Sequence, residues 1–235
     1  MTVIVAIPAR VASTRLPRKL LLEESGQPLF THVFGQVAKC RLVDACVVVT
    51  GDEEICERCD KWQLPHFSTV EDHPNGTSRI AEFAEAADDL LHDDIIVNVQ
   101  ADEPEIDPNA IDLLISQHKI ARPDMGTLVC SLDDVLKDLP NVVKAVVDYD
   151  GSVSDFHREY DPGAWQWHHI GIYSYSPEFL RRYRERGPCK TEVDRDLEQM
   201  RAIEIGAQIR AWPIRSHMPG IDTREQYDAF LARLG

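Results

Sequence analysis

Short runs of β-branched and other apolar residues alternate along this chain with segments whose apolar residues recur every three or four positions. The first pattern is typical of buried strands and the second of amphipathic helices. Because the two alternate through most of the length, we predict an α/β fold with three layers, in which helices cover both faces of a mainly parallel mixed sheet. The predicted strands are Val3–Ile7, Ala45–Thr50, His66–Thr69, Ile95–Val99, Thr127–Ser131, Val142–Val147, His168–Tyr175 and Gln208–Trp212, and the predicted helices are Leu29–Arg41, Glu53–Gln63, Thr77–Leu91, Pro108–His118, Pro177–Arg184, Glu192–Ile205 and Arg224–Leu234.

The alternation changes near Asp148–Gly151, where a strand, a turn and a short strand lead into an irregular stretch with Pro162, Gly163 and nearby tryptophans. We interpret residues 149–175 as a small β insertion on the sheet. No internal repeat and no Gly/Ser/Pro-rich linker divides the sequence, so residues 1–235 are predicted to form a single domain.

The net charge limits the classes of partner. With 25 Lys and Arg against 40 Asp and Glu, the formal charge is −15. Such a surface repels phosphate backbones and anionic lipids, so we expect no nucleic acid and no membrane as partners. Any phosphate site must be local. The apolar stretch Thr2–Ala9 is too short to span a bilayer and lacks a basic leader, which predicts a strand and a cytoplasmic protein.

Cysteine chemistry has little support. The chain has six cysteines, most of them isolated among helix and strand patterns, which is unlike a disulfide framework. Cys56 and Cys59 have the spacing of a redox or zinc pair, but no second pair or paired histidines would complete four ligands. They also fall within a predicted helix, so a structural role is favoured.

The loop after the first strand is the most informative segment. In an open α/β sheet, ligands bind outside the carboxyl ends of the strands. Residues 8–19 contain four cations and no acid. Small residues there allow backbone N–H groups to approach phosphate oxygens, which favours a polyphosphate site over a solvated basic loop paired with surface carboxylates. The spacings of a P-loop and of a Gly-x-Gly-x-x-Gly fingerprint are missing. The candidate residues are Ala9, Arg10, Ser13, Thr14, Arg15 and Lys19.

The string Ile-Pro-Ala-Arg-x-x-Ser-Thr-Arg-Leu-Pro-x-Lys of this loop resembles the nucleotide-binding loop of the 3-deoxy-manno-octulosonate (Kdo) cytidylyltransferases, also called CMP-Kdo synthetases. Asp72–Arg79 and Val97–Pro104 resemble two further motifs of that family, with Asn75 and Ser78 where the family usually has Ser and Glu. The resemblance implies a nucleotide-diphospho-sugar transferase-like fold. It also implies an enzyme that activates Kdo with CTP to give a CMP-sugar and pyrophosphate, for surface polysaccharide synthesis of the lipopolysaccharide type.

Two aspartates are candidate ligands of Mg²⁺. Asp102 follows the strand Ile95–Val99, at the edge where phosphates would lie, and carboxylate oxygen suits this cation. Asp222 is the natural second ligand, although it could instead cap the last helix in a box with Glu225. Thr223 with Gln226 makes an equally good box and leaves Asp222 free. The resemblance favours the metal role for both.

Further nucleotide contacts are expected at two places. The amide of Gln100 is both donor and acceptor, which suits the Watson–Crick edge of cytosine. The resemblance to the family implies the same role. Gly76–Arg79 begins a helix, so its free N–H groups could face an anion or a base carbonyl, unless the segment is only a good helix start. The nucleotide-binding residues predicted here are Asn75, Gly76, Arg79, Gln100 and Asp102.

The acceptor side follows from strand periodicity. His169, Tyr173 and Tyr175 share one face of the strand His168–Tyr175, and with Arg158 they could form a pocket in which Arg binds the carboxylate of a sugar acid. A structural histidine is an equal reading of His169 from the sequence, and resemblance to the family's sugar-binding histidine favours function. Glu198 and Gln199 resemble further sugar contacts, or could face solvent.

The insertion between Arg158 and His169 is shorter than the family pattern and contains Trp165 and Trp167. The same region contributes to the dimer contact in relatives, so the resemblance implies a homodimer.

The hypothesis is an in-line nucleotidyl transfer in which Arg10, Arg15 and Lys19 bind the triphosphate and Asp102 acts with Mg²⁺. No Ser-His-Asp or Cys-His arrangement suggests a nucleophile on the enzyme. Two alternatives remain: activation of another acid sugar, such as an amino-Kdo or a sialic-type acid, and a nucleotide-sensing module without turnover. The presence of both Asp102 and Asp222 favours catalysis.

Overall fold

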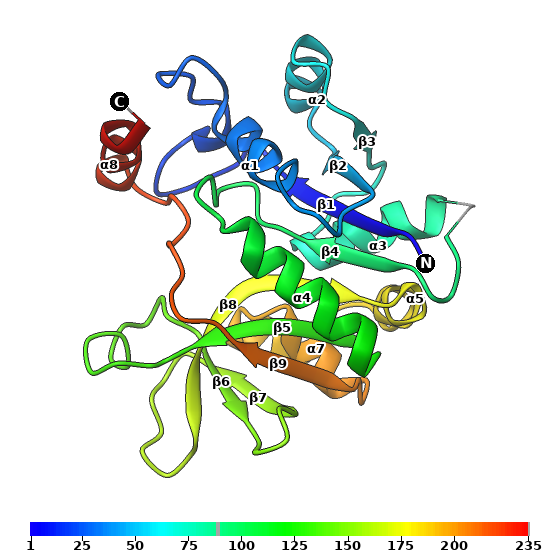
Figure 1. Ribbon diagram of the computed structural model, residues 1–235, viewed down its shortest axis with the longest axis vertical. Helices are drawn as coiled ribbons and strands as arrows, with labels where there is room; N and C mark the ends of the chain where they lie inside the picture. Colours follow the sequence, from blue (N-terminus) through cyan, green and yellow to red (C-terminus); the bar gives the residue numbers. More distant parts are fainter. Residues whose placement is uncertain (88–89, 235) are drawn as a thin grey trace.

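The computed structural model describes residues 1–87 and 90–234, and in these ranges the strands join into one mixed sheet (Figure 1). Along its main path the order is β3-β2-β1-β4-β8-β5-β9. The first four of these strands are parallel, β8 is antiparallel to both of its neighbours, and β9 is parallel to β5. The predicted mainly parallel mixed sheet is therefore confirmed. The strands are β1 Val3–Ala9, β2 Ala45–Thr50, β3 His66–Ser68, β4 Ile95–Asn98, β5 Met125–Cys130, β6 Lys144–Val147, β7 Val153–His157, β8 Gln166–Tyr175 and β9 Ile209–Pro213.

Two apolar layers lie on opposite faces of this sheet. Val5 and Ile7 of β1 point into the layer shared with α1, α2, α4 and α8, whereas Ala6 points into the layer shared with α3, α5 and α7. Figure 1 shows α4 in front of the sheet and α7 behind it. This alternation gives strands buried on both sides, as expected for the central strands of a three-layer fold. The helices are α1 Leu29–Val37, α2 Glu53–Lys61, α3 Gly76–Ala86, α4 Pro108–Ala121, α5 Pro177–Arg186, α6 Lys190–Arg195, α7 Gln199–Glu204 and α8 Arg224–Leu234, with a short 3₁₀ turn at Lys19–Leu21.

The predicted β insertion is a small antiparallel extension in which β6 pairs with both β7 and the start of β8. Its base is held by Lys144, whose side chain is fully buried and whose Nζ donates to the carbonyl oxygens of Val142 and Arg158. Because a buried ammonium needs acceptors on several sides, these bonds fix the loops that flank the insertion. β6 begins at Lys144, two residues later than predicted.

Several helices end or break earlier than their periodicity predicts. α1 stops at Val37 instead of Arg41, since the backbone N–H groups of Arg41 and Leu42 donate to the carboxylate of Asp112. The predicted helix 192–205 is two helices, α6 and α7, because Asp196 adopts the left-handed conformation with φ 51°. α3 ends at Ala86, and part of its predicted extension, residues 88–89, lies outside the described residues.

None of the helices in the described ranges is both long and apolar enough to cross a membrane.

Candidate active site

A cavity of about 700 Å³ lies where β1 and β4 end. Its wall combines the loop after β1, the turn after β4, the start of α3 and Asp222, which precedes α8. Every residue predicted to bind the nucleotide or the metal lines this cavity. These residues are Ala9, Arg10, Ser13, Thr14, Arg15, Lys19, Asn75, Gly76, Arg79, Gln100, Asp102 and Asp222.

Other lining residues were not predicted. Pro8, Ala12 and Ala101 are sequence neighbours of predicted residues, so their place follows from the same two loops. His73 also lines the cavity and lies within the motif Asp72–Arg79, which was the signal that could have identified it.

Lys19 joins the two aspartates at one side of the cavity. Its Nζ donates to Asp102 Oδ2 at 2.6 Å and to Asp222 Oδ1 at 2.7 Å. Arg15 adds a second cation, at 2.8 Å from Asp222 Oδ2. Burial lowers the pKa of Lys19, but the charges and hydrogen bonds of the two carboxylates outweigh burial and raise this pKa above its usual value. Residues far apart in the sequence thus form one compact charge cluster.

Asp222 is free of helix capping. Gln226 Oε1 accepts hydrogen bonds from the backbone N–H groups of Asp222 and Thr223, at 2.7 and 3.0 Å, and Gln226 N donates weakly to Thr223 Oγ1 at 3.4 Å. The predicted box of Thr223 with Gln226 is confirmed, and Glu225 is not needed for it. The side chain of Asp222 is therefore directed to Lys19 and Arg15 instead of to its own helix.

The loop after β1 is held from below by Asp52, whose Oδ2 accepts from the backbone N–H of Val11 at 2.7 Å. Arg79 is buried beside it, and its Nη1 donates to Thr69 Oγ1 at 3.0 Å. Burial lowers the pKa of Arg79, and the nearby charge of Arg10 lowers it further. An arginine pair in a partly buried wall favours an anionic ligand, since such a ligand reduces their mutual repulsion.

Gly76 allows the start of α3 to approach the loop after β1. A Cβ on Gly76 would lie 3.1 Å from Pro8 Cγ, which is tighter than an ordinary contact. Glycine thus permits the close approach that brings Asn75 and Gly76 into the cavity wall.

The N–H groups at the start of α3 are less available than the sequence suggested. Thr77 N donates to the carboxylate of Glu198 at 3.0 Å, and Ser78 N donates to Asn75 Oδ1 at 2.8 Å. A carboxylate already occupies the positive end of this helix, which disfavours a phosphate at the same N–H groups. The expectation of an anion at these N–H groups is therefore corrected, and the segment contributes to the cavity through Gly76 and side chains.

The residues predicted for the sugar acid lie apart from the cavity wall. His169 and Tyr173 are buried in a ladder of rings along β8, with centroids 5.4 Å apart, and His169 Nε2 lies 3.1 Å from Thr127 Oγ1. Burial lowers the pKa of His169 to about 3. Tyr173 donates to Gln199 Oε1 at 3.5 Å, while Arg158 donates to the carbonyl oxygen of Asp196 at 3.0 Å.

Glu198 and Gln199 do not face solvent. Gln199 is buried, and Glu198 is bound at the start of α3, where burial raises its pKa. The strand face predicted from the sequence is real, but Arg158 is turned to Asp196 instead of to that face.

All six cysteines are free thiols. Burial raises the pKa of Cys59 to about 12, and that of Cys56 is also raised, first by burial. Thiols with raised pKa values are poor nucleophiles and metal ligands, which agrees with the structural reading of this pair.

The sequence is similar to a known family of enzymes over most of its length. A family model described as Cytidylyltransferase matches residues 4–209. A relative from Rhodopirellula baltica named 3-deoxy-manno-octulosonate cytidylyltransferase is 37% identical over all of this chain and 99% of its own length. The chain belongs to the 3-deoxy-manno-octulosonate cytidylyltransferase family. Another relative of that name, from Geobacter sulfurreducens, is 35% identical over the full length of both chains.

Among solved structures, one titled as CMP:2-keto-3-deoxy-manno-octonic acid synthetase complexed with CTP superposes with a TM-score of 0.90. The two chains are 27% identical, and the match covers 100% of this chain and 98% of the other. The resemblance seen in the sequence is confirmed at the level of family and fold, and the chain is a cytidylyltransferase.

Proposed function

We propose that this cytidylyltransferase transfers CMP from CTP to 3-deoxy-manno-octulosonate and releases pyrophosphate. The relatives' names and the similar structure titled as a CTP complex support the two substrates. The observation that carries the proposal is the cluster in which Lys19 lies between Asp102 and Asp222, beside a cationic loop and a cavity of about 700 Å³.

Mg²⁺ is part of this proposal, with Asp102 and Asp222 as its protein ligands. The residues fit the ion because two carboxylates converge on a single cationic group, and both are hard oxygen ligands that leave room for phosphate and water. When bound, Mg²⁺ supplies Lewis acidity at the α-phosphate and favours the ionised form of the attacking hydroxyl.

The cations of the loop would bind and orient the triphosphate. Arg15 and Lys19 provide positive charge on the side of the cavity where the aspartates lie, Arg10 adds charge elsewhere in its wall, and this charge would stabilise the departing pyrophosphate. The anomeric oxygen forms a bond to the α-phosphorus, the bond from that phosphorus to the bridging oxygen of pyrophosphate breaks, and the hydroxyl proton leaves to solvent. No covalent enzyme intermediate is needed.

Gln100 is the proposed reader of the cytosine base. Among the described residues, its Nε2 makes two long hydrogen bonds, both at 3.4 Å, to Asn98 Oδ1 and to the carbonyl oxygen of Gly171. An amide held this loosely can exchange these bonds for shorter ones to a base edge.

The acceptor is proposed to lie over β8, next to the nucleotide cavity. The two regions meet where a Cβ on Gly171 would lie 4.0 Å from Gln100 Cγ. His169, Tyr173, Gln199 and Glu198 would form the inner wall of this site. Arg158 would have to leave Asp196, to which it is bound through an exposed contact, in order to bind the carboxylate.

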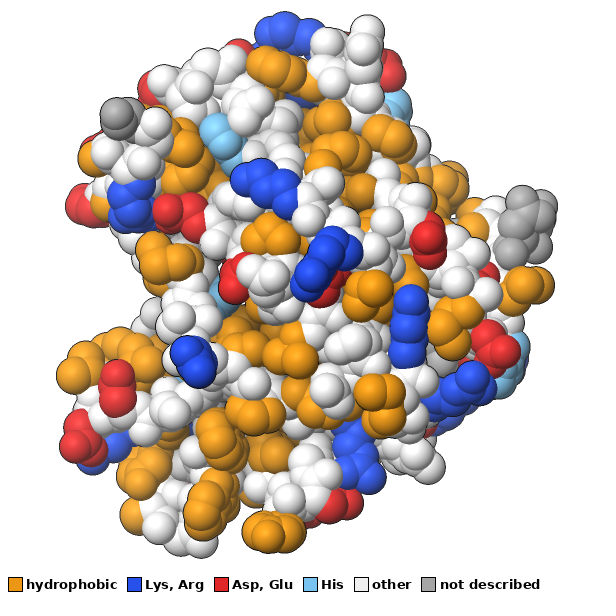
Figure 2. All heavy atoms as spheres, in the orientation of Figure 1, with side chains coloured by type: hydrophobic (Ala, Val, Ile, Leu, Met, Phe, Trp, Pro, Cys, Tyr) orange, Lys and Arg blue, Asp and Glu red, His pale blue; other side chains and the backbone are white. Residues whose placement is uncertain are grey.

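The insertion is the proposed contact between two copies of the chain. Figure 2 shows hydrophobic side chains gathered over the lower part of the molecule, where β6, β7 and their loops lie. Trp165 and Tyr160 are exposed there. Sedimentation equilibrium on the wild type and on Trp165→Ser should give a dimer and a weakened dimer, and a wild-type monomer at all concentrations would contradict this contact.

A coupled pyrophosphate assay tests the activity. Purified protein with CTP, Kdo and Mg²⁺ should release pyrophosphate, and omission of Kdo, addition of EDTA, or replacement of CTP by ATP, GTP or UTP should each abolish the signal. A panel with amino-Kdo and a sialic acid tests the acceptor, and a clear preference for either would refute Kdo as the substrate. CTP binding without pyrophosphate release for any acceptor would refute catalysis.

A further inference from the structure

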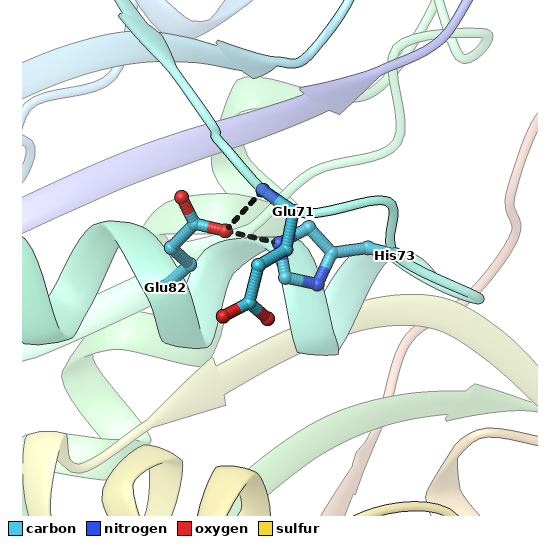
Figure 3. Close-up of side chains that lie close together, drawn as sticks. All are labelled: Glu71, His73 and Glu82. Atoms are coloured by element: carbon cyan, nitrogen blue, oxygen red, sulfur yellow. Dashed lines mark hydrogen bonds and ion pairs between the residues drawn. The ribbon is translucent and has the colours of Figure 1, made fainter.

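One carboxylate outside the predicted site holds the segment that leads into the nucleotide cavity. Glu82, on the second turn of α3, is buried and faces the segment 69–75 between β3 and α3. Its Oε1 accepts from the backbone N–H of Val70 at 2.6 Å. Its Oε2 accepts from the backbone N–H of Glu71 at 3.3 Å and lies 2.6 Å from His73 Nε2 (Figure 3).

Apolar burial does little to fix this segment. The side chain of Val70 is 94% exposed, and Glu71 is exposed as well. The segment is tied at one end by the bond from Thr69 N to the carbonyl oxygen of Thr50, and at the other by the Asn75 cap of α3. Between these ends, Glu82 makes the hydrogen bonds that set the backbone path and the orientation of the His73 ring.

Two carboxylates and a histidine could also suggest a metal site, since ligand atoms of Glu71, His73 and Glu82 lie within 4.8 Å of one another. The hydrogen bonds disfavour it. Both oxygens of Glu82 already accept bonds from N–H groups, and Glu71 pairs with Arg184 Nη2 at 2.8 Å. Arg184 Nη1 also lies 4.0 Å from Glu82 Oε2, so a guanidinium already supplies the positive charge that an ion would bring.

Glu82 is held in its ionised form, which accepts hydrogen bonds at both oxygens. Burial raises its pKa, but the bonds from Val70, His73 and Glu71 outweigh burial and hold the pKa below its usual value. An ionised carboxylate makes charge-assisted bonds, which are stronger than neutral ones.

The segment held in this way forms part of the nucleotide cavity. His73 and Asn75 line its wall together with Arg79, which lies one turn before Glu82 on the same face of α3. We infer that Glu82 is a positioning residue for nucleotide binding, which holds His73 and residues 70–75 in the shape that accepts CTP. This inference rests on the proposed function and adds to it a residue that does not itself line the cavity.

The test compares four variants with the wild type. Glu82→Gln offers one acceptor oxygen and one donor group where two acceptor oxygens serve three N–H groups, so at least one N–H group loses its partner. Glu85→Gln is the matched control, because Glu85 is exposed on the same helix and its Oε2 lies 2.8 Å from Nε of Arg184, the arginine that also lies near Glu82. His73→Gln keeps an N–H donor for Glu82, whereas His73→Phe keeps a ring without one.

The readouts are the Kd for CTP by isothermal titration calorimetry, kcat and KM for CTP, and hydrogen exchange of the segment. We expect Glu82→Gln and His73→Phe to raise Kd and KM about tenfold. Their kcat at saturating CTP should stay within about threefold, because Lys19 and Asp102 are untouched. Glu85→Gln should stay close to the wild type, and His73→Gln should lose less affinity for CTP than His73→Phe, because it keeps the donor to Glu82. In Glu82→Gln the amide of Val70 or that of Glu71 should lose protection from exchange, according to which oxygen the amide nitrogen replaces.

Several results would overturn the inference. A lower Tm for Glu82→Gln with an unchanged Kd for CTP would make Glu82 a structural residue only. If Glu82→Gln does not fold, Glu82→Asp provides the same comparison, since its shorter side chain withdraws the carboxylate. Stabilisation of the wild type by Zn²⁺ or Mn²⁺ that is lost in Glu82→Gln would favour a metal site. A wild type that binds no CTP would refute the proposed function, whereas normal CTP binding by all variants would refute only the inference.

Discussion

Replacement of Asp102 by Asn is the sharpest test of the proposed chemistry, because it removes one charge and almost no volume. In the wild type, Asp102 Oδ2 accepts from Lys19 Nζ at 2.6 Å, and its backbone oxygen accepts from the N–H of Ile221 at 2.8 Å. The backbone bond does not depend on the side chain. Lys19 also keeps its bond to Asp222 at 2.7 Å. The fold should therefore survive.

The expected effects differ widely in size. The ion pair between Lys19 and Asp102 becomes a hydrogen bond from the Lys19 ammonium to a neutral amide oxygen, which costs about 1 kcal/mol of stability and lowers Tm by roughly 2–4 °C in a chain of this size. In contrast, the loss of a ligand for a Lewis-acid cation should cost about 4 kcal/mol in the transition state, or about a thousandfold in rate.

Pyrophosphate release at saturating CTP and Kdo, measured across a Mg²⁺ titration, checks this expectation, with differential scanning fluorimetry for stability. Asp228→Asn is a matched control, since Asp228 forms an exposed pair with Arg224 on α8. If Asp102→Asn kept its rate within tenfold of the wild type and the same Mg²⁺ dependence, the assignment of Asp102 to the cation would fail.

Three further perturbations test other parts of the structure. Gly76→Ala places a Cβ 3.1 Å from Pro8 Cγ and should raise KM for CTP several-fold, and an unchanged KM would show that the approach is not needed. His169→Gln should make the free energy of unfolding, measured with urea, depend less on pH between pH 4 and 7. The folded pKa of about 3 lies below the usual 6.5, so the unfolded chain binds the proton first, and the wild type loses up to about 3 kcal/mol as pH falls through this window. An equal slope in both proteins would contradict a neutral, buried His169. Gln226→Ala removes the partner of two N–H groups before α8 and should cost about 1 kcal/mol of stability, which a Tm equal to that of the wild type would exclude.

The sequence predicted the layers and most strands because buried strands carry their own signal. Val3, Val5 and Ile7 alternate with residues that face the opposite helices, and both sides must be apolar when helices cover both faces. The nucleotide cavity was also predictable, since a cationic loop after the first strand and acids after a neighbouring strand meet at the same edge of the sheet.

Helix ends and side-chain partners were not predictable in this way. The bond from Arg41 to Asp112 and the left-handed turn at Asp196 depend on residues that approach only in the folded chain. The same holds for Glu198, which reaches the start of α3 from a distant helix, and for Arg158, which bonds to Asp196 instead of facing β8.

By itself, the sequence determined the alternation of strands and helices, the loop chemistry at the end of β1 and the identity of the residues around the cavity. The alternation and the place of the loop depend on short-range periodicity and on the rule that parallel strands end at one edge, whereas several residues around the cavity were identified from the resemblance to the family. Only the tertiary structure decided that Lys19 lies between Asp102 and Asp222, and that Glu82 holds the segment before α3. Local sequence cannot specify such contacts, because a buried charge is paired with whichever group the packing of distant elements brings within hydrogen-bonding distance.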